Sequence, residues 1–170
     1  MKAFSRYYPF GISVLVFALD RLTKWIIEKN VSPWETIVVI PGFFQIVHTQ
    51  NRGAAFGIFA DSSSEWRTLI LIGLSVAVMI FIATLLIQAI RGVAKQHALQ
   101  KIALGLVLGG ALGNVYDRVL AGSVTDFLEF FIGAYRFPAF NVADSAITVG
   151  AGLLILDIWR TRHDKVEPET

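Results

Sequence analysis

The chain of 170 residues contains no cysteine, which excludes disulfides, a thiolate nucleophile, cysteine-ligated zinc and lipidation of a cysteine side chain. Charged residues make up only 16% of the sequence, and the net charge is +2. The basic residues are scattered, so we expect no nucleic-acid partner. The three histidines stand apart, without H-E-x-x-H spacing, and we expect no metal and no cofactor.

Apolar residues, in contrast, are abundant: 55% of the chain belongs to the set AVILMFWYC, and the mean hydropathy is +0.60. Too little polar surface remains to cover a water-soluble globule. Four apolar runs are long enough to cross a hydrocarbon core of about 30 Å at about 1.5 Å per helical residue. The predicted spans are 10–27, 68–90, 102–120 and 140–159. We therefore predict an all-α membrane protein with four transmembrane helices, forming a single membrane-embedded domain over 1–170 with a polar tail at 160–170.

The basic residues outside these spans indicate the orientation. The two ends of the chain and the connection 91–101 together hold eight Lys and Arg, whereas the longer connections 28–67 and 121–139 together hold four. The positive-inside rule then places both termini in the cytoplasm and both longer connections outside.

The connection between the first two spans has the pattern of a small external β-hairpin or sheet. Residues 36–40 and 43–49 are rich in β-branched and aromatic types, and Pro41 and Gly42 form a turn signal between them. The second external connection, 121–139, is dense in aromatic residues, which is typical of a segment at the bilayer interface.

Each acidic residue at the centre of a membrane-spanning helix raises the free energy of insertion by about 2.5 to 3.5 kcal/mol. In the predicted topology, Asp20, Asp117 and Asp144 all lie toward the outer ends of their spans, and Asp126 follows in the adjoining loop. Asp20 precedes Lys24 by one helical turn, so an intrahelical ion pair that anchors the helix is a structural explanation for both residues.

Two of these acids, Asp126 and Asp144, bracket one short external loop and can meet near the outer surface. Two carboxylates in a poorly hydrated site cannot both ionise, so they share a proton and present a base beside an acid. That pair can hydrolyse a peptide: one group takes a proton from water and the other donates to the scissile carbonyl. From spacing alone, two unrelated interface aspartates remain the alternative.

Other residues of the spans favour packing and support. Asn114 shares a helix face with Asp117 and Arg118, which is typical of a polar bracket between helices. Small residues recur in the third span, and they recur in the fourth span from near Asp144 to Gly150. These smooth faces favour close helix packing, and the same pattern is compatible with docking of a substrate helix, for which Gly109 and Ala146 are the predicted contacts.

Three other classes of protein compete with a two-aspartate peptidase. A proton-coupled transporter or channel uses intramembrane acids, but such folds commonly show paired repeats, and this chain shows none. A serine protease with Lys24 as base lacks a nearby membrane serine and a G-x-S-x-G motif. A non-catalytic membrane scaffold is the third alternative.

Five motifs on the predicted spans and their two longer connections resemble the lipoprotein signal peptidases, also called type II signal peptidases, of bacterial inner membranes. They are DRLTK at 20–24, NRGAAFG at 51–57, GGALGNVYDR at 109–118, GSVTDF at 122–127 and FNVADS at 140–145. Their order matches the family along nearly the whole chain. Arg52 is the least typical residue among them, and its charge bears on substrate or headgroup contacts rather than on the chemistry.

The resemblance implies an aspartic endopeptidase of the bacterial inner membrane in which Asp126 and Asp144 are catalytic. It implies a supporting role for Asp20, Lys24, Asn51, Gly53, Asn114, Asp117, Arg118, Asn141 and Ala143. The implied substrate is a prolipoprotein whose cysteine carries diacylglycerol, cut on the N-terminal side of that cysteine. The implied partners are these prolipoproteins and membrane lipids, with function as a monomer and inhibition by globomycin-type cyclic peptides.

Overall fold

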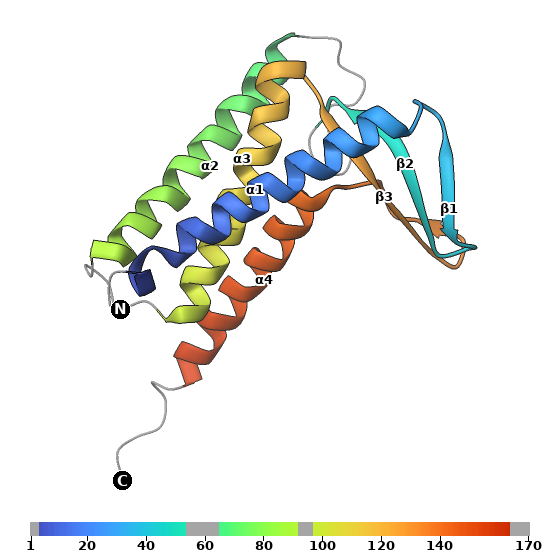
Figure 1. Ribbon diagram of the computed structural model, residues 1–170. Helices are drawn as coiled ribbons and strands as arrows, with labels where there is room; N and C mark the ends of the chain where they lie inside the picture. The colour runs from blue at the N-terminus through green and yellow to red at the C-terminus, as the bar shows by residue number, and fades with distance from the viewer. Residues whose placement is uncertain (1–3, 54–64, 92–96, 164–170) are drawn as a thin grey trace.

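The computed structural model describes residues 4–53, 65–91 and 97–163. The elements follow in the order α1 (Phe4–Asn30), β1 (Thr36–Ile40), β2 (Phe44–Asn51), α2 (Glu65–Arg91), α3 (Ala98–Ala121), β3 (Val124–Ile132), β4 (Tyr135–Arg136) and α4 (Val142–His163). The helices lie side by side, and the sheet projects from one end of them (Figure 1). The start of α1 and the end of α4 both lie at the opposite end. Residues 54–57 of the second motif and 164–170 of the predicted tail are outside the described residues.

Each predicted span corresponds to a helix, with differences at the ends. α4 begins at Val142 rather than at 140, because Phe140 forms a β-bridge with Leu128 and Asn141 caps the helix. α4 also continues to His163, so the polar tail predicted from 160 begins at least four residues later than expected.

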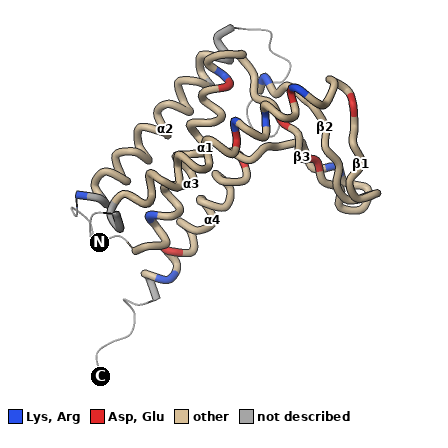
Figure 2. The backbone as a smooth tube through the Cα atoms, in the orientation of Figure 1, with Lys and Arg blue, Asp and Glu red and all other residues tan. Residues whose placement is uncertain are grey.

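Two helical stretches in the described part of the chain are both long and apolar enough to cross a membrane, Ala98–Ala121 and Val142–Thr161. The most apolar stretch of α2, Ile72–Gln88, is shorter. Along the helices most of the tube is uncharged, and charged positions gather near the sheet and at the helix ends (Figure 2).

α3 packs against the other three helices, and its glycines allow the closest approaches. A Cβ atom on Gly109 would lie 2.6 Å from Ser13 O of α1, and a Cβ atom on Gly105 would lie 2.6 Å from Pro9 O. These contacts leave no space for another helix on this face. The prediction that Gly109 contacts a substrate helix is therefore wrong: α1 occupies that face.

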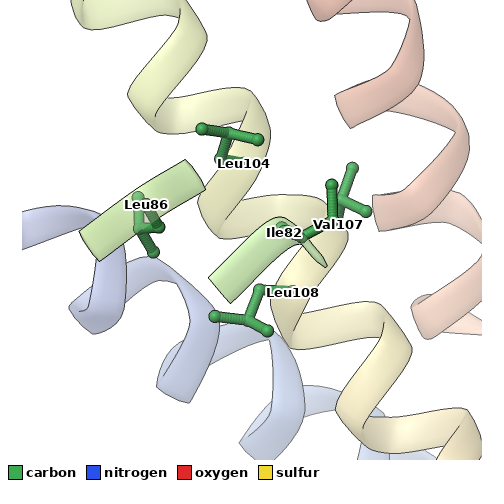
Figure 3. Packing of buried hydrophobic residues seen from close by; sticks show 5 residues of the cluster. All are labelled: Ile82, Leu86, Leu104, Val107 and Leu108. Atoms are coloured by element: carbon green, nitrogen blue, oxygen red, sulfur yellow. The ribbon is translucent and has the colours of Figure 1, made fainter. Parts of the chain in front are cut away.

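The main apolar cluster joins α2 to α3. Ile82 and Leu86 of α2 meet Leu104, Val107 and Leu108 of α3, and Leu86 and Leu104 are completely buried (Figure 3). The cluster lies along the helices and away from the sheet, so it holds the bundle together without contributing to the polar end of the molecule.

The sheet is larger than the predicted hairpin. β1 and β2 pair antiparallel as predicted, but β3 joins the other edge of β2 and β4 follows, giving the order β1-β2-β3-β4. Half of the sheet thus comes from the connection 121–139, which we expected to be an aromatic interface loop. The first four residues of β3, 124–127, are all buried, so this part of the strand is covered on both faces, which explains the difference: the segment is a central strand rather than a surface loop.

Candidate active site

The first turn of α4 presents one of the two candidate catalytic acids. Asn141 is the N-cap: its side-chain Oδ1 accepts a hydrogen bond from Asp144 N at 2.9 Å, while Asp144 Oδ2 accepts one from Asn141 N at 3.3 Å. This reciprocal pair is a capping box, in which the third helical residue carries the carboxylate. The start of the helix therefore fixes the position of the Asp144 side chain.

The other candidate acid, Asp126, lies on β3. Its Oδ1 accepts a hydrogen bond from Asn141 Nδ2 at 2.7 Å, and its Oδ2 accepts one from Asn51 Nδ2 at 3.0 Å. Phe140 N donates to Leu128 O, and Phe140 O accepts from the N–H groups of Leu128 and Phe127, which brings the N-cap of α4 beside the strand. Asn141 thus contacts both acids at once.

Asn114 of α3 connects this pair to the helices. Its Nδ2 donates to Asp144 Oδ1 at 2.7 Å, and its Oδ1 accepts from Lys24 Nζ at 3.1 Å and from Asn141 Nδ2 at 3.3 Å. Since an ammonium group can only donate, Lys24 fixes which end of the Asn114 amide faces Asp144.

Lys24 is itself completely buried and lies between two carboxylates. Its Nζ is 2.8 Å from Asp20 Oδ2 and 2.7 Å from Asp117 Oδ2, and Asp117 also pairs with Arg21. The predicted intrahelical pair of Asp20 with Lys24 is present. Asp20 Oδ1 further accepts a hydrogen bond from Ala143 N at 3.0 Å, so this group holds α1 against the start of α4.

Gly53 and Arg118 are the last two members of this group of connected site residues. Gly53 N donates to Asn51 Oδ1 at 2.8 Å, and Arg118 Nη2 lies 3.5 Å from Gly53 O. The guanidinium of Arg118 is within electrostatic range of both Asp126 and Asp144. The structure therefore brings all eleven residues named from the sequence into one connected polar group, drawn from α1, β2, α3, β3 and α4.

The environment of Asp126 favours its protonated form. Burial, the largest cause, and the negative charge of Asp144 raise the pKa of the Asp126 carboxyl from its ordinary value of 3.8 to about 7. Hydrogen bonds from Asn51 and Asn141 and the charge of Lys24 act in the opposite direction. Near neutral pH the pair can therefore hold one proton, which provides an acid beside a base.

Nothing in the described segments resembles a metal centre: no group of three or more histidine and acidic side chains there could hold an ion. The charges nearest the two aspartates are the cations Lys24 and Arg118, and the remaining partners are asparagine amides and backbone N–H groups. This arrangement has the groups needed to activate water by proton transfer.

Sequence reasoning missed a second polar group on the other face of the sheet. It contains Glu28, Gln50, Ser123 and Thr125, which are joined by hydrogen bonds of 2.7 to 3.0 Å. The signal for a strand was available in the β-branched and aromatic residues of the run 124–132, but the aromatic content of that segment was interpreted as typical of an external loop at the bilayer interface.

A buried aspartate, Asp126, and a half-buried one, Asp144, share Asn141 at one end of a bundle of apolar helices, and this arrangement suits a class of membrane-embedded hydrolases that use two carboxyl groups. Residues 12–160 match the family described as Signal peptidase (SPase) II. The chain belongs to this peptidase family. The match decides against the transporter, serine-protease and scaffold alternatives.

Relatives and solved structures agree with this assignment. The chain is 52% identical over 158 residues to a lipoprotein signal peptidase of Solibacter usitatus, covering 93% of this chain and 94% of the relative. It is 44% identical over 160 residues to that of Pseudomonas aeruginosa, covering 94% and 92%. A solved structure described as a bacterial membrane enzyme, determined by the in meso method at 2.3 Å, has a TM-score of 0.81 at 32% identity and covers 96% of this chain and 94% of its own.

Proposed function

We propose that this protein removes the signal peptide from diacylglyceryl-modified bacterial prolipoproteins by cutting on the N-terminal side of the lipidated cysteine. Membership of the signal peptidase II family and the names of the relatives, lipoprotein signal peptidase, support this activity. The diacylglyceryl group partitions into lipid, which holds the modified cysteine at the membrane interface and favours capture within the plane of the membrane.

The observation that carries the proposal is the contact of Asn141 with both acids. Asn141 Nδ2 donates to Asp126 Oδ1 at 2.7 Å, and the N–H of Asn141 and its amide oxygen hold Asp144 in the capping box. Asp126 and Asp144 are the catalytic residues in this proposal. The ionised member of the pair takes a proton from water, and the protonated member donates to the oxygen of the scissile carbonyl.

The remaining site residues keep the pair in place. Asn51 and Asn114 each donate to one acid, and Gly53 holds Asn51 through its N–H group. Lys24, with Asp20 and Asp117, fixes the orientation of Asn114. The other supporting members of the site are Asn141, Ala143 and Arg118. We assign these residues to binding and orientation rather than to proton transfer.

We also propose that all four helices cross the bacterial inner membrane, with both termini in the cytoplasm and the sheet in the periplasm. The positive-inside count supports this orientation. The position of the sheet at the end of the bundle opposite the start of α1 and the end of α4 is compatible with it (Figure 1). The active site then faces the periplasmic surface, in a single domain over 1–170 that works as a monomer among membrane lipids and is inhibited by globomycin-type cyclic peptides.

The test is a cleavage assay with purified protein and a diacylglyceryl prolipoprotein, monitored by release of the signal peptide. Asp126→Asn and Asp144→Asn each remove the ability to exchange a proton at one member of the pair. We expect each variant to insert and fold but to lose activity by about a thousandfold or more.

Asp157→Asn is the matched control, because Asp157 is a buried acid on α4 far along the helix from Asp144. It should cleave like the wild type, and chelators should leave all rates unchanged. Full cleavage by Asp126→Asn or Asp144→Asn would show that the replaced residue is not part of the catalytic pair. Failure of the wild type to cleave would refute the proposed function.

A further inference from the structure

Thr125 lies immediately before Asp126, on the opposite face of β3. Successive side chains of a strand point to opposite faces, so Thr125 is directed away from the catalytic pair. Its side chain is buried, with 3% exposed. The hydroxyl donates to Glu28 Oε1 of α1 at 2.7 Å and accepts from Gln50 Nε2 of β2 at 3.0 Å.

The donors and acceptors of this group run in one direction. Ser123 Oγ donates to Gln50 Oε1 at 2.9 Å, the Gln50 amide donates to Thr125, and Thr125 donates to Glu28. The chain of hydrogen bonds ends on a carboxylate, and hydrogen bonds to ionised acceptors are shorter and stronger than neutral ones. The group therefore joins β2, β3 and the last turn of α1 in one fixed arrangement.

The same part of the sheet follows an irregularity in its register. The pairing of β2 with β3 shifts between Ile46 and Thr49, and after this irregularity only Thr49, Gln50 and Asn51 remain paired with β3. A bulge interrupts the ladder and changes the direction of the side chains that follow it. Asn51, which donates to Asp126, belongs to this short paired segment. The position of its side chain relative to Asp126 therefore depends on the contacts that fix the neighbouring Gln50.

We propose that Thr125, held by Glu28 and Gln50, is a positioning residue that keeps Asp126 within reach of Asn51 and Asn141. This inference rests on the proposed function, in which Asp126 and Asp144 are the catalytic pair. Thr125 does not touch the reacting atoms. It acts by fixing β3 against β2 and α1 from behind, so that the carboxyl group on the front of the strand is held in the buried site. The backbone contact of Asn141 Nδ2 with Thr125 O, at 3.4 Å, continues the connection to α4.

The deciding variants are Thr125→Val, which removes the hydroxyl at constant shape, and Thr125→Ser, which retains it. We expect Val to lower kcat about tenfold, the size of a lost net hydrogen bond, with KM changed by less than about twofold. Ser should restore kcat. Thr36→Val is the matched control, because Thr36 is exposed on β1, two strands away, and the same substitution there should change nothing.

A second readout does not depend on activity. The ¹³C resonance of the Asp126 carboxyl, assigned by its loss in Asp126→Asn, reports the titration of that group. The pKa of Asp126 is raised mainly by burial, so a looser strand that admits water should lower it in Thr125→Val and leave it unchanged in Thr125→Ser.

Unchanged kcat and an unchanged Asp126 titration in Thr125→Val would overturn the positioning role, and so would failure of Ser to restore either. A wild-type protein that titrates as described but does not cleave would refute the proposed function instead. The titrations of the Val and Ser variants would still decide the role of Thr125.

Discussion

Replacing Asp126 by Asn should stabilise the protein more at high pH than at low pH. Burial and the charge of Asp144 raise the pKa of Asp126 from 3.8 to about 7, so the folded state disfavours the ionised form of the group. A carboxyl group whose pKa is raised on folding contributes a stability that is fully present below its ordinary pKa of 3.8. This stability is lost as the pH rises through about 7. Asparagine does not titrate, so the variant lacks this loss.

The size of the effect follows from the two pKa values. At pH 5 the folded wild type keeps the Asp126 proton, whereas at pH 8 the group is mostly ionised in both states. Linkage over this interval predicts that wild-type stability falls relative to Asp126→Asn by about 3 kcal/mol. One of the hydrogen bonds from Asn51 or Asn141 is lost in the variant, but that cost is nearly the same at both pH values and cancels in the difference.

The assay is reversible unfolding of the wild type and the variant in lipid bicelles at pH 5 and pH 8. Asn30→Ala is the control, because it removes a side chain whose hydrogen bond is to Ile26 O and changes no titratable group. Its effect on stability should be equal at the two pH values. A stability difference between wild type and Asp126→Asn that is the same at both, or that changes in the opposite direction, would refute the argument that burial controls this carboxyl.

The other predictions concern packing and buried charge. Gly110→Ala places a methyl group against the backbone oxygen of Ala143 and should destabilise the protein by about 1 to 3 kcal/mol in thermal unfolding. Gly73→Ala, whose Cβ would meet nothing within 4 Å, should be neutral or stabilising, and equal effects at the two glycines would contradict the packing of α3 on α4. Lys24→Met leaves two buried carboxylates without their shared cation and should cost about 3 to 5 kcal/mol, measured by denaturant unfolding. Lys29 is exposed and contacts a tryptophan ring, so Lys29→Met should lower the stability by less than about 1 kcal/mol. A similar loss of stability in both lysine variants would count against the buried ion group.

Local signals were sufficient for the helices and for one hairpin. The apolar runs predicted four helices with boundary differences of a few residues, and the turn at Pro41 and Gly42 predicted the pairing of β1 with β2. The spacing of Asp20 and Lys24 by one helical turn predicted their ion pair, which the structure contains at 2.8 Å. In each case the residues that interact are close in sequence, so periodicity and spacing describe them.

Predictions that depended on distant partners were less successful. The aromatic content of the segment around Phe127 indicated an external loop but not a strand, because aromatic residues are compatible with lipid or with a core. Only pairing with β2, more than seventy residues earlier in the chain, makes it a central strand. The glycines of α3 likewise predicted a smooth face but not its occupant, which is α1 at Gly109 and α4 at Gly110.

The sequence alone determined that the chain is apolar and helical and that its spans contain acidic residues, which are costly in a membrane, because composition and span length are properties of the chain itself. It also supplied the motifs that resemble a peptidase family. Only the tertiary structure decided that Asn141 contacts both Asp126 and Asp144, and that Thr125, the residue before Asp126, bonds to Glu28 and Gln50. The physical reason is that hydrogen bonds between distant elements depend on where the backbone brings each donor, and no local pattern records that distance.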